Sequence, residues 1–177
     1  MSDNVKIASS ISTPFTSPRK RSELTAKKIA EHLGLTYSVV ESLPPINPGE
    51  LAGLKEKTAW EKYPSLMETR VRFRDKQCNG YKICFPKGDS LYDYENDISN
   101  GFHSLLSKEK NFILITHRSV MLALLNIFSK KLKGYAQDKY FYFETPKGLI
   151  LKLTTNKICS SGNIEVIGSY EIWKKLL

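Results

Sequence analysis

Apolar residues recur along this chain with two spacings, which together predict alternating strands and helices. A helical spacing indicates helices at 17–33, at 54–63 and from Ser90 onward. Short continuous apolar runs indicate strands, of which 112–116 is the clearest because it is apolar on both faces, as in a central parallel strand covered by helices. One further strand is expected within 5–16. The pattern therefore predicts an α/β fold.

Two runs near the end of the chain complete the predicted strands. The segments 148–153 and 164–167 are separated by a Gly162-Asn163 turn, so we expect them to pair as a hairpin.

The first predicted helix begins in a basic stretch. Ser17 is expected to cap it, Pro18 to occupy its first position and Gly34 to end it. Arg21 then falls in the first turn, where peptide N–H groups point outward and can bind a phosphate or another oxyanion together with the guanidinium. A capped helix with a solvated basic first turn is the alternative for this stretch taken alone.

A histidine follows the best predicted strand. His117 comes directly after 112–116, and a new helix is expected to begin near Ser119. This order places His117 at the carboxyl edge of the sheet, where α/β proteins bind ligands. A buried imidazole with a purely structural role is the alternative for a lone histidine.

The segment 65–87 shows no clear periodicity and is expected to be an irregular, functional loop or a solvated face. It carries six basic residues: Arg70, Arg72, Arg74, Lys76, Lys82 and Lys87.

Net charge, apolar content and cysteine number limit the partners, location and cofactors that the chain is expected to have. The net charge of +9 favours anionic partners such as phosphate esters, whereas scattered lysines without a nucleic-acid motif predict no nucleic-acid partner. No apolar run is long enough to cross a membrane. Three cysteines without metal-like spacing indicate reduced thiols, a cytoplasmic location and no bound metal, and no cofactor-binding motif is present, so no cofactor is expected.

The motifs occur in an order that resembles the histidine phosphatase (phosphoglycerate-mutase-like) superfamily. The order is strand–SPxxR–helix–TA, then LxxxxxGxxxG, then FPKGDS, then strand–THxxV–helix. Within that superfamily, TSPRKRSELTA, FPKGDSLYD and TPKGLILKLT are similar to the bisphosphatase half of the 6-phosphofructo-2-kinase/fructose-2,6-bisphosphatase family. The resemblance implies a three-layer α/β/α fold with a mostly parallel sheet, spanning 11–168, with tails at 1–10 and 169–177.

The resemblance also implies roles for four residues. Arg21 matches a phosphate-clamping arginine that grips two phosphoryl oxygens, and His117 matches the second active-site histidine, which hydrogen-bonds the transferred phosphoryl group. Arg70 matches an arginine that binds the sugar diphosphate, and Lys76 matches a substrate-binding lysine.

The departures from the family pattern concern the chemistry. The chain has no RHG motif, which carries the family's nucleophilic histidine on its first strand, and Pro45 occupies the position of the proton-donating glutamate. The covalent route then lacks both its phosphoryl acceptor and the protonation of its leaving group. An absent N-terminal strand is expected to leave a gap beside 112–116.

We therefore expect a degenerate fructose-2,6-bisphosphatase-like domain. It would resemble a phosphoric monoester hydrolase and bind phosphosugars, but turn them over slowly or not at all as this chain alone. A non-catalytic regulatory or interaction module of the same fold is one alternative, and part of a longer or split phosphatase is another. The expected partners are a phosphorylated sugar or other small anion, a second copy of the chain, or a kinase domain joined covalently or non-covalently.

Overall fold

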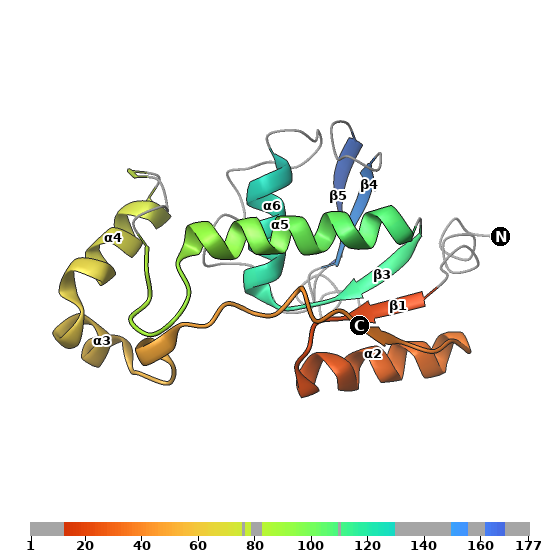
Figure 1. Ribbon diagram of the computed structural model, residues 1–177, viewed down its shortest axis with the longest axis horizontal. Helices are drawn as coiled ribbons and strands as arrows, with labels where there is room; N and C mark the ends of the chain where they lie inside the picture. The colour runs from red at the N-terminus through yellow and green to blue at the C-terminus, as the bar shows by residue number, and fades with distance from the viewer. Residues whose placement is uncertain are drawn as a thin grey trace. The chain divides into compact units, whose positions relative to one another are not determined.

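A small parallel sheet organises one of the two compact units of the computed structural model, which describes residues 13–75, 77–78, 83–109, 111–129, 150–155 and 162–168 (Figure 1). The chain divides into two compact units, and the boundaries run through two helices. The first unit comprises Met1–Ile46 with Asn96–Met121, and the second comprises Asn47–Glu95 with Leu122–Leu177.

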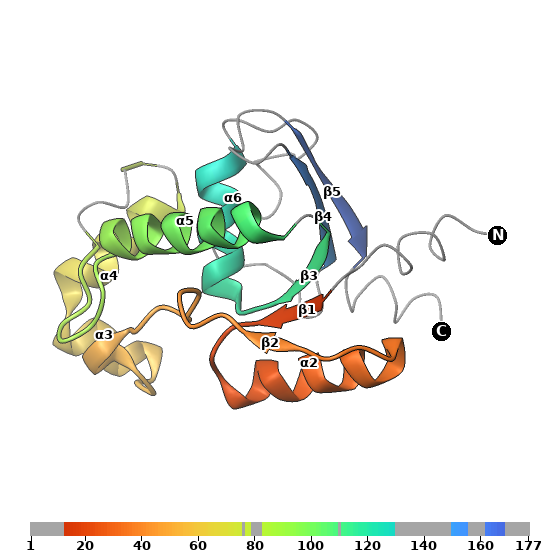
Figure 2. The ribbon, with the colours of Figure 1, turned by 45° about the vertical axis from the view of Figure 1, so that its right-hand side comes forward.

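The sheet of the first unit is built from three parallel strands. They are β1 (Thr13–Thr16), β2 (Ser38–Val39) and β3 (Phe112–Ile115), in the order β2-β1-β3. The register pairs Thr16 with Ile115, so β1 and β3 end at the same edge (Figure 2). The strand expected within 5–16 is confirmed at β1, while its possible earlier part at 5–8 lies outside the described residues.

The helix after β1 starts later than the sequence predicted. Helix α2 spans Lys20–Leu33, and Arg19 takes the N-cap position with an extended backbone and no capping side chain. The prediction that Ser17 caps the helix and that Pro18 is its first residue is therefore wrong. Ser17 instead continues the strand, because its N–H donates to the carbonyl of Ile115 at 3.0 Å.

The predicted end of this helix is confirmed. Gly34 has a φ of 66°, the left-handed conformation that glycine adopts at no steric cost. The next N–H, of Leu35, donates to the carbonyl of Ala30 at 2.9 Å, which closes the last turn.

Helices cover both faces of the parallel sheet. Helix α2 lies on one side of β1 and β3, and the 96–108 part of α5 (Leu91–Lys108) lies on the other (Figure 2). The predicted apolar stripe of α5 is confirmed, since Ile98, Phe102 and Leu105 are buried, and the Phe102 ring lies 6.3 Å from that of Phe112. The four side chains of β3 are only partly buried, in contrast to the prediction, and β1 is the only described strand that pairs with β3.

The second unit contains a helix that the sequence did not reveal. After the 3-10 helix η1 (Gly49–Leu51) come α3 (Glu56–Lys62) and α4 (Pro64–Arg74), so the prediction of an irregular segment from residue 65 is wrong up to residue 74. Pro64 occupies an early position of α4, where a missing N–H costs nothing. The apolar residues of α4 are distributed around the helix and form no stripe on one face, so the sequence pattern did not predict it.

The remaining helices and strands form near their predicted positions. The start of α5 is capped as expected, because the Asp93 N–H donates to the Ser90 hydroxyl at 3.1 Å. Helix α6 covers Arg118–Ser129, and strands β4 (Ile150–Thr155) and β5 (Gly162–Gly168) pair antiparallel as the expected hairpin. The predicted turn at Gly162-Asn163 is wrong, because these two residues belong to β5 and pair with Thr155 and Thr154. Among the described residues, no helix combines the length and apolar content needed to cross a bilayer.

We predict that Gly101→Ala destabilises the first unit by about 1–3 kcal/mol, because an added methyl overpacks the contact between α5 and the segment after β2. A Cβ at Gly101 would lie 2.5 Å from the carbonyl oxygen of Ser42, and that oxygen belongs to backbone that cannot move freely. Urea unfolding measures the change.

Ser104→Ala is the control, since Ser104 is exposed on the same helix. An unchanged or increased free energy of unfolding for Gly101→Ala would contradict the close approach.

Candidate functional site

Two chain segments meet at the edge where β1 and β3 end. Ser17 follows β1 and Thr116 follows β3, and their hydroxyl oxygens lie 2.6 Å apart. Ser17 is fully buried and Thr116 is half-buried, so the contact is partly shielded from solvent. The parallel register therefore brings the SPxxR segment and the TH segment together, as the sequence predicted for strands of one sheet.

His117 lies in this edge with its ring largely removed from solvent. It is 8% exposed, and its Nε2 lies 3.4 Å from the hydroxyl of Ser22. Burial lowers the pKa of His117 below its ordinary value of 6.5, and the guanidinium groups of Arg21 and Arg19 lower it further. The imidazole is thus neutral at neutral pH.

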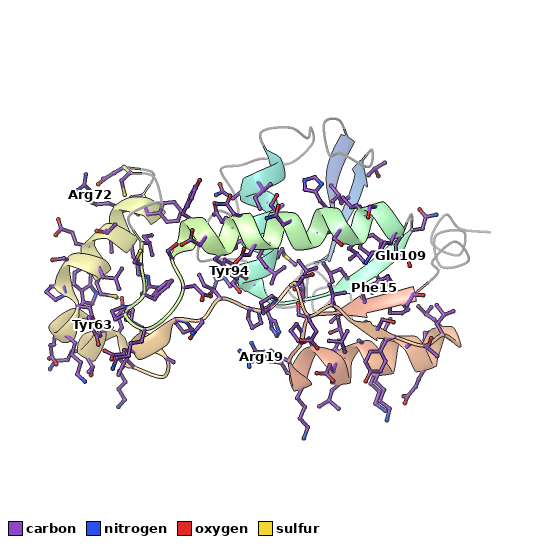
Figure 3. All side chains as sticks on the ribbon, viewed as in Figure 1. Phe15, Arg19, Tyr63, Arg72, Tyr94 and Glu109 are labelled. Carbon is purple, nitrogen blue, oxygen red and sulfur yellow. The ribbon has the colours of Figure 1, made fainter. Side chains whose placement is uncertain are left out.

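Arg21 lies in the first turn of α2, as predicted, and its side chain is exposed. Its positive charge contributes to the lowered pKa of His117. Arg19, at the N-cap, adds a second cation where β1 leads into α2 (Figure 3). Cations beside outward-pointing helical N–H groups form an environment that attracts an anion.

The segment that carries Pro45 borders the same edge. It leaves β2, whose pairing continues as the Val40 N–H donates to the carbonyl of Thr16 at 2.8 Å. It then reaches α6, where the Ile46 N–H donates to the hydroxyl of Ser119 at 3.1 Å, two residues from His117. Pro45 has no ionisable group, so this segment offers no side-chain proton donor at that position.

The second unit holds Arg70, and the structure describes that unit by itself. Arg70 lies in α4, with its guanidinium carbon 5.9 Å from the centre of the Phe85 ring and its Nη1 3.3 Å from the sulfur of Met67. Burial lowers its pKa, an effect that Glu56 opposes. Lys76 lies outside the described residues. Of the four predicted site residues, Arg21 and His117 lie in the first unit, next to the ends of β1 and β3, and Arg70 lies in the second.

The FPKGDS motif packs against the loop that contains η1. The Asn47 N–H donates to an oxygen of Asp89 at 2.7 Å, and the Glu50 N–H donates to the carbonyl of Pro86 at 2.8 Å. The FPKGDS motif and the loop from Asn47 to Glu50 therefore form one substructure of the second unit.

Glu50, in η1, is a conceivable replacement for the acid that Pro45 lacks, but its environment opposes that role. Lys87 contacts its carboxylate at 2.6 Å, and Tyr63, between α3 and α4 (Figure 3), donates a hydrogen bond to it. The hydrogen bond from Lys87, followed by that from Tyr63, lowers the pKa of Glu50. A carboxyl group that stays ionised at lower pH is a poorer proton donor.

Sequence reasoning missed Ser22 and Thr116 as residues of this site. Ser22 is 4% exposed, and it lines up at four-residue spacing with the buried Ala26 and Ala30 on the inner face of α2. That spacing of small residues is the signal that places Ser22 on the inward face of the helix. Its contact with His117 depends on the pairing of β1 with β3, which no local pattern specifies.

Comparison with protein families agrees with this arrangement. The model of the histidine phosphatase superfamily (branch 1) matches residues 5–156. The 6-phosphofructo-2-kinase/fructose-2,6-bisphosphatase 1 of Bos taurus is 32% identical over 139 residues, which cover 78% of this chain and 26% of the relative. Its Homo sapiens counterpart is 31% identical over 140 residues, covering 79% and 26%. The chain spans about a quarter of the length of these relatives.

Solved structures support the same fold. Bacillus stearothermophilus YhfR aligns with a TM-score of 0.67 at 14% identity, covering 94% of this chain and 81% of that one. A mycobacterial glucosyl-3-phosphoglycerate phosphatase in complex with inorganic phosphate aligns with a TM-score of 0.62 at 16% identity, covering 93% and 82%. The small parallel sheet, the helices on both of its faces and the matched motifs lead to one conclusion: this chain belongs to the histidine phosphatase superfamily.

Proposed function

We propose that this chain is a phosphate-ester-binding domain related to the fructose-2,6-bisphosphatases, with Arg21 and His117 at its anion site. The observation that carries the proposal is the shared edge of β1 and β3, where the charge of Arg21 acts on a buried imidazole. The identity to the bisphosphatase relatives supports a phosphorylated sugar as the ligand. Arg70 and Lys76 would then bind the sugar-phosphate portion.

Arg21 suits a phosphoryl group because of its geometry. A guanidinium presents paired donors that match two oxygens of a phosphate, which an ammonium does not. Arg19 lies two residues earlier and adds positive charge, so the site attracts anions before any contact forms. The exposed position of Arg21 leaves its donors accessible to a ligand from solvent.

The chemistry that this chain supports is limited. Its sequence contains no Arg-His-Gly motif, and Pro45 stands where the family places a proton-donating glutamate. Arg21 can neutralise phosphoryl charge and His117 can hydrogen-bond the phosphoryl group, but Arg21 cannot replace the missing proton donor, since an arginine does not release a proton. We therefore propose binding with little or no turnover for the 177-residue chain on its own.

Arg21→Ala is predicted to weaken phosphate binding about 10- to 100-fold, because a hydrogen bond to a charged group contributes about 1.5–3 kcal/mol. Isothermal titration calorimetry with fructose 6-phosphate measures the effect. Lys28→Ala removes the same charge from an exposed position farther along α2 and serves as the control. Equal losses in the two variants would indicate a general charge effect and contradict a site at Arg21.

Anion binding is predicted to strengthen as the pH falls. The lowered pKa of His117 means that the ring gains its positive charge only below its ordinary range, and an anion favours that charged form. Sulfate is the probe, since it remains a dianion between about pH 5 and pH 8, where histidine titrates.

The wild-type chain should bind sulfate more tightly toward the lower pH, and His117→Gln should bind it with little pH dependence. A similar pH dependence in both proteins would show that His117 is not the responsible group.

Turnover of fructose 2,6-bisphosphate is predicted to be absent or far below one event per second, against a typical enzyme rate of about 10 per second. Release of inorganic phosphate from a large excess of substrate measures it. A His117→Ala variant purified in the same way accounts for contaminating phosphatases. Multiple turnovers by the wild-type chain that this variant loses would contradict the proposal of impaired catalysis.

A further inference from the structure

We propose that Ser22 is a positioning residue, which holds the His117 ring so that Nε2 carries a proton and Nδ1 is the nitrogen left for the anion. The inference rests on the proposed function, since it specifies how His117 meets the anion there. Its basis is the set of contacts that the Ser22 hydroxyl makes in the interior of the first unit.

The Ser22 hydroxyl is surrounded by acceptors. Its oxygen lies 2.8 Å from the carbonyl oxygen of Ser17 and 2.8 Å from that of Arg19, so its single proton can be donated to either carbonyl. The side chain is 4% exposed, so water does not readily replace these partners. The third neighbour is Nε2 of His117 at 3.4 Å.

Counting protons decides the direction of the contact with His117. A hydroxyl has one proton and two lone pairs, whereas a carbonyl can only accept. If the proton pointed at Nε2, both carbonyl oxygens would face hydroxyl lone pairs at 2.8 Å. The Ser22 hydroxyl therefore donates its proton toward the carbonyls of Ser17 and Arg19. Its oxygen accepts a hydrogen bond from an Nε2–H of His117.

This assignment defines the second nitrogen of the ring. With Nε2 protonated, the neutral imidazole has a lone pair on Nδ1, and no described residue forms a hydrogen bond with that atom. Arg21 and Arg19 are the charged groups that act on the ring, and both disfavour its protonation. Because Nδ1 has no hydrogen-bond partner among the described residues and His117 is only 8% exposed, Nδ1 is the atom to which an anion can hydrogen-bond.

Binding of a fully ionised anion then requires proton uptake. A lone pair on Nδ1 repels an anionic oxygen, so the ring takes one proton from solvent at Nδ1 and donates that N–H to the anion. The positive charge of the imidazolium remains, and no covalent bond forms or breaks. A protonated phosphate can instead bring its own proton and donate it to Nδ1 without charging the ring.

Nitrogen NMR of the histidine side chains tests the assignment without any ligand. Above its pKa, the neutral His117 ring is expected to show a protonated Nε2 with a detectable, slowly exchanging Hε2, and His117→Gln assigns the signal. In Ser22→Ala the Hε2 signal should be lost to exchange and the tautomer ratio should move toward that of free imidazole. Ser22→Thr should restore both, because it retains the hydroxyl.

Sulfate titration links the contact to binding. Ser22→Ala is expected to weaken sulfate binding about two- to tenfold, the range for one neutral hydrogen bond, and Ser22→Thr is expected to recover most of the loss. Calorimetry in two buffers of different ionisation enthalpy should detect uptake of close to one proton per sulfate by the wild-type chain above the pKa of His117.

The outcomes separate this inference from the proposed function. A neutral wild-type ring protonated on Nδ1, or an Hε2 signal unchanged in Ser22→Ala, overturns the role of Ser22 even when sulfate binds. The wild-type tautomer is measured without Ser22→Ala, so the inference can be tested even if that variant does not fold. Absence of any sulfate or phosphate binding by the wild-type chain overturns the proposed function, and the role of Ser22 in anion binding with it.

Discussion

The parallel pairing of β1 with β3 is the constraint on which the candidate site depends. Nearly one hundred residues separate Thr16 from Ile115, yet the register makes them partners. Because both strands end at that pair, the two segments that follow must begin side by side. The short contact between Ser17 and Thr116 continues this alignment past the last ladder position. A shift of one residue would turn every side chain to the opposite face and separate His117 from α2.

The same pairing determines the charge of the site. The imidazole of His117 is buried because it sits between the end of β3 and the start of α2, and its pKa is lowered chiefly for that reason. The neutral ring carries no positive charge, and the arginines at the start of α2 supply it instead. A neutral imidazole beside cations can bind an anion if the ring gains a proton from the anion or from solvent. A site made only of arginines would carry the same charge at every pH. We infer that this combination makes binding sensitive to pH.

Much of this fold could be predicted from the sequence, because strong local signals were present. The run at β3, the stripe on α5 and the stop at Gly34 each correspond to an element or boundary of the structure. Two of the wrong predictions have identifiable causes. Ser17 resembled a helix cap, but tertiary pairing with Ile115 drew it into the strand, and α4 has no apolar stripe by which to recognise it.

The candidate site was predictable only in part. Arg21 and His117 belong to motifs that can be recognised in the sequence, whereas Ser22 has a role in the site only through its contact with His117, 95 positions away. The direction of the Ser22 hydrogen bond depends on two carbonyls of the turn after β1, and their orientation is a product of the fold.

The central claim is that an anion binds where β1 and β3 end. Backbone amide NMR during a phosphate titration tests it most directly. The account predicts the largest shift changes at residues 17–22 and 116–119; changes confined to other residues, or none at saturating phosphate, would contradict it.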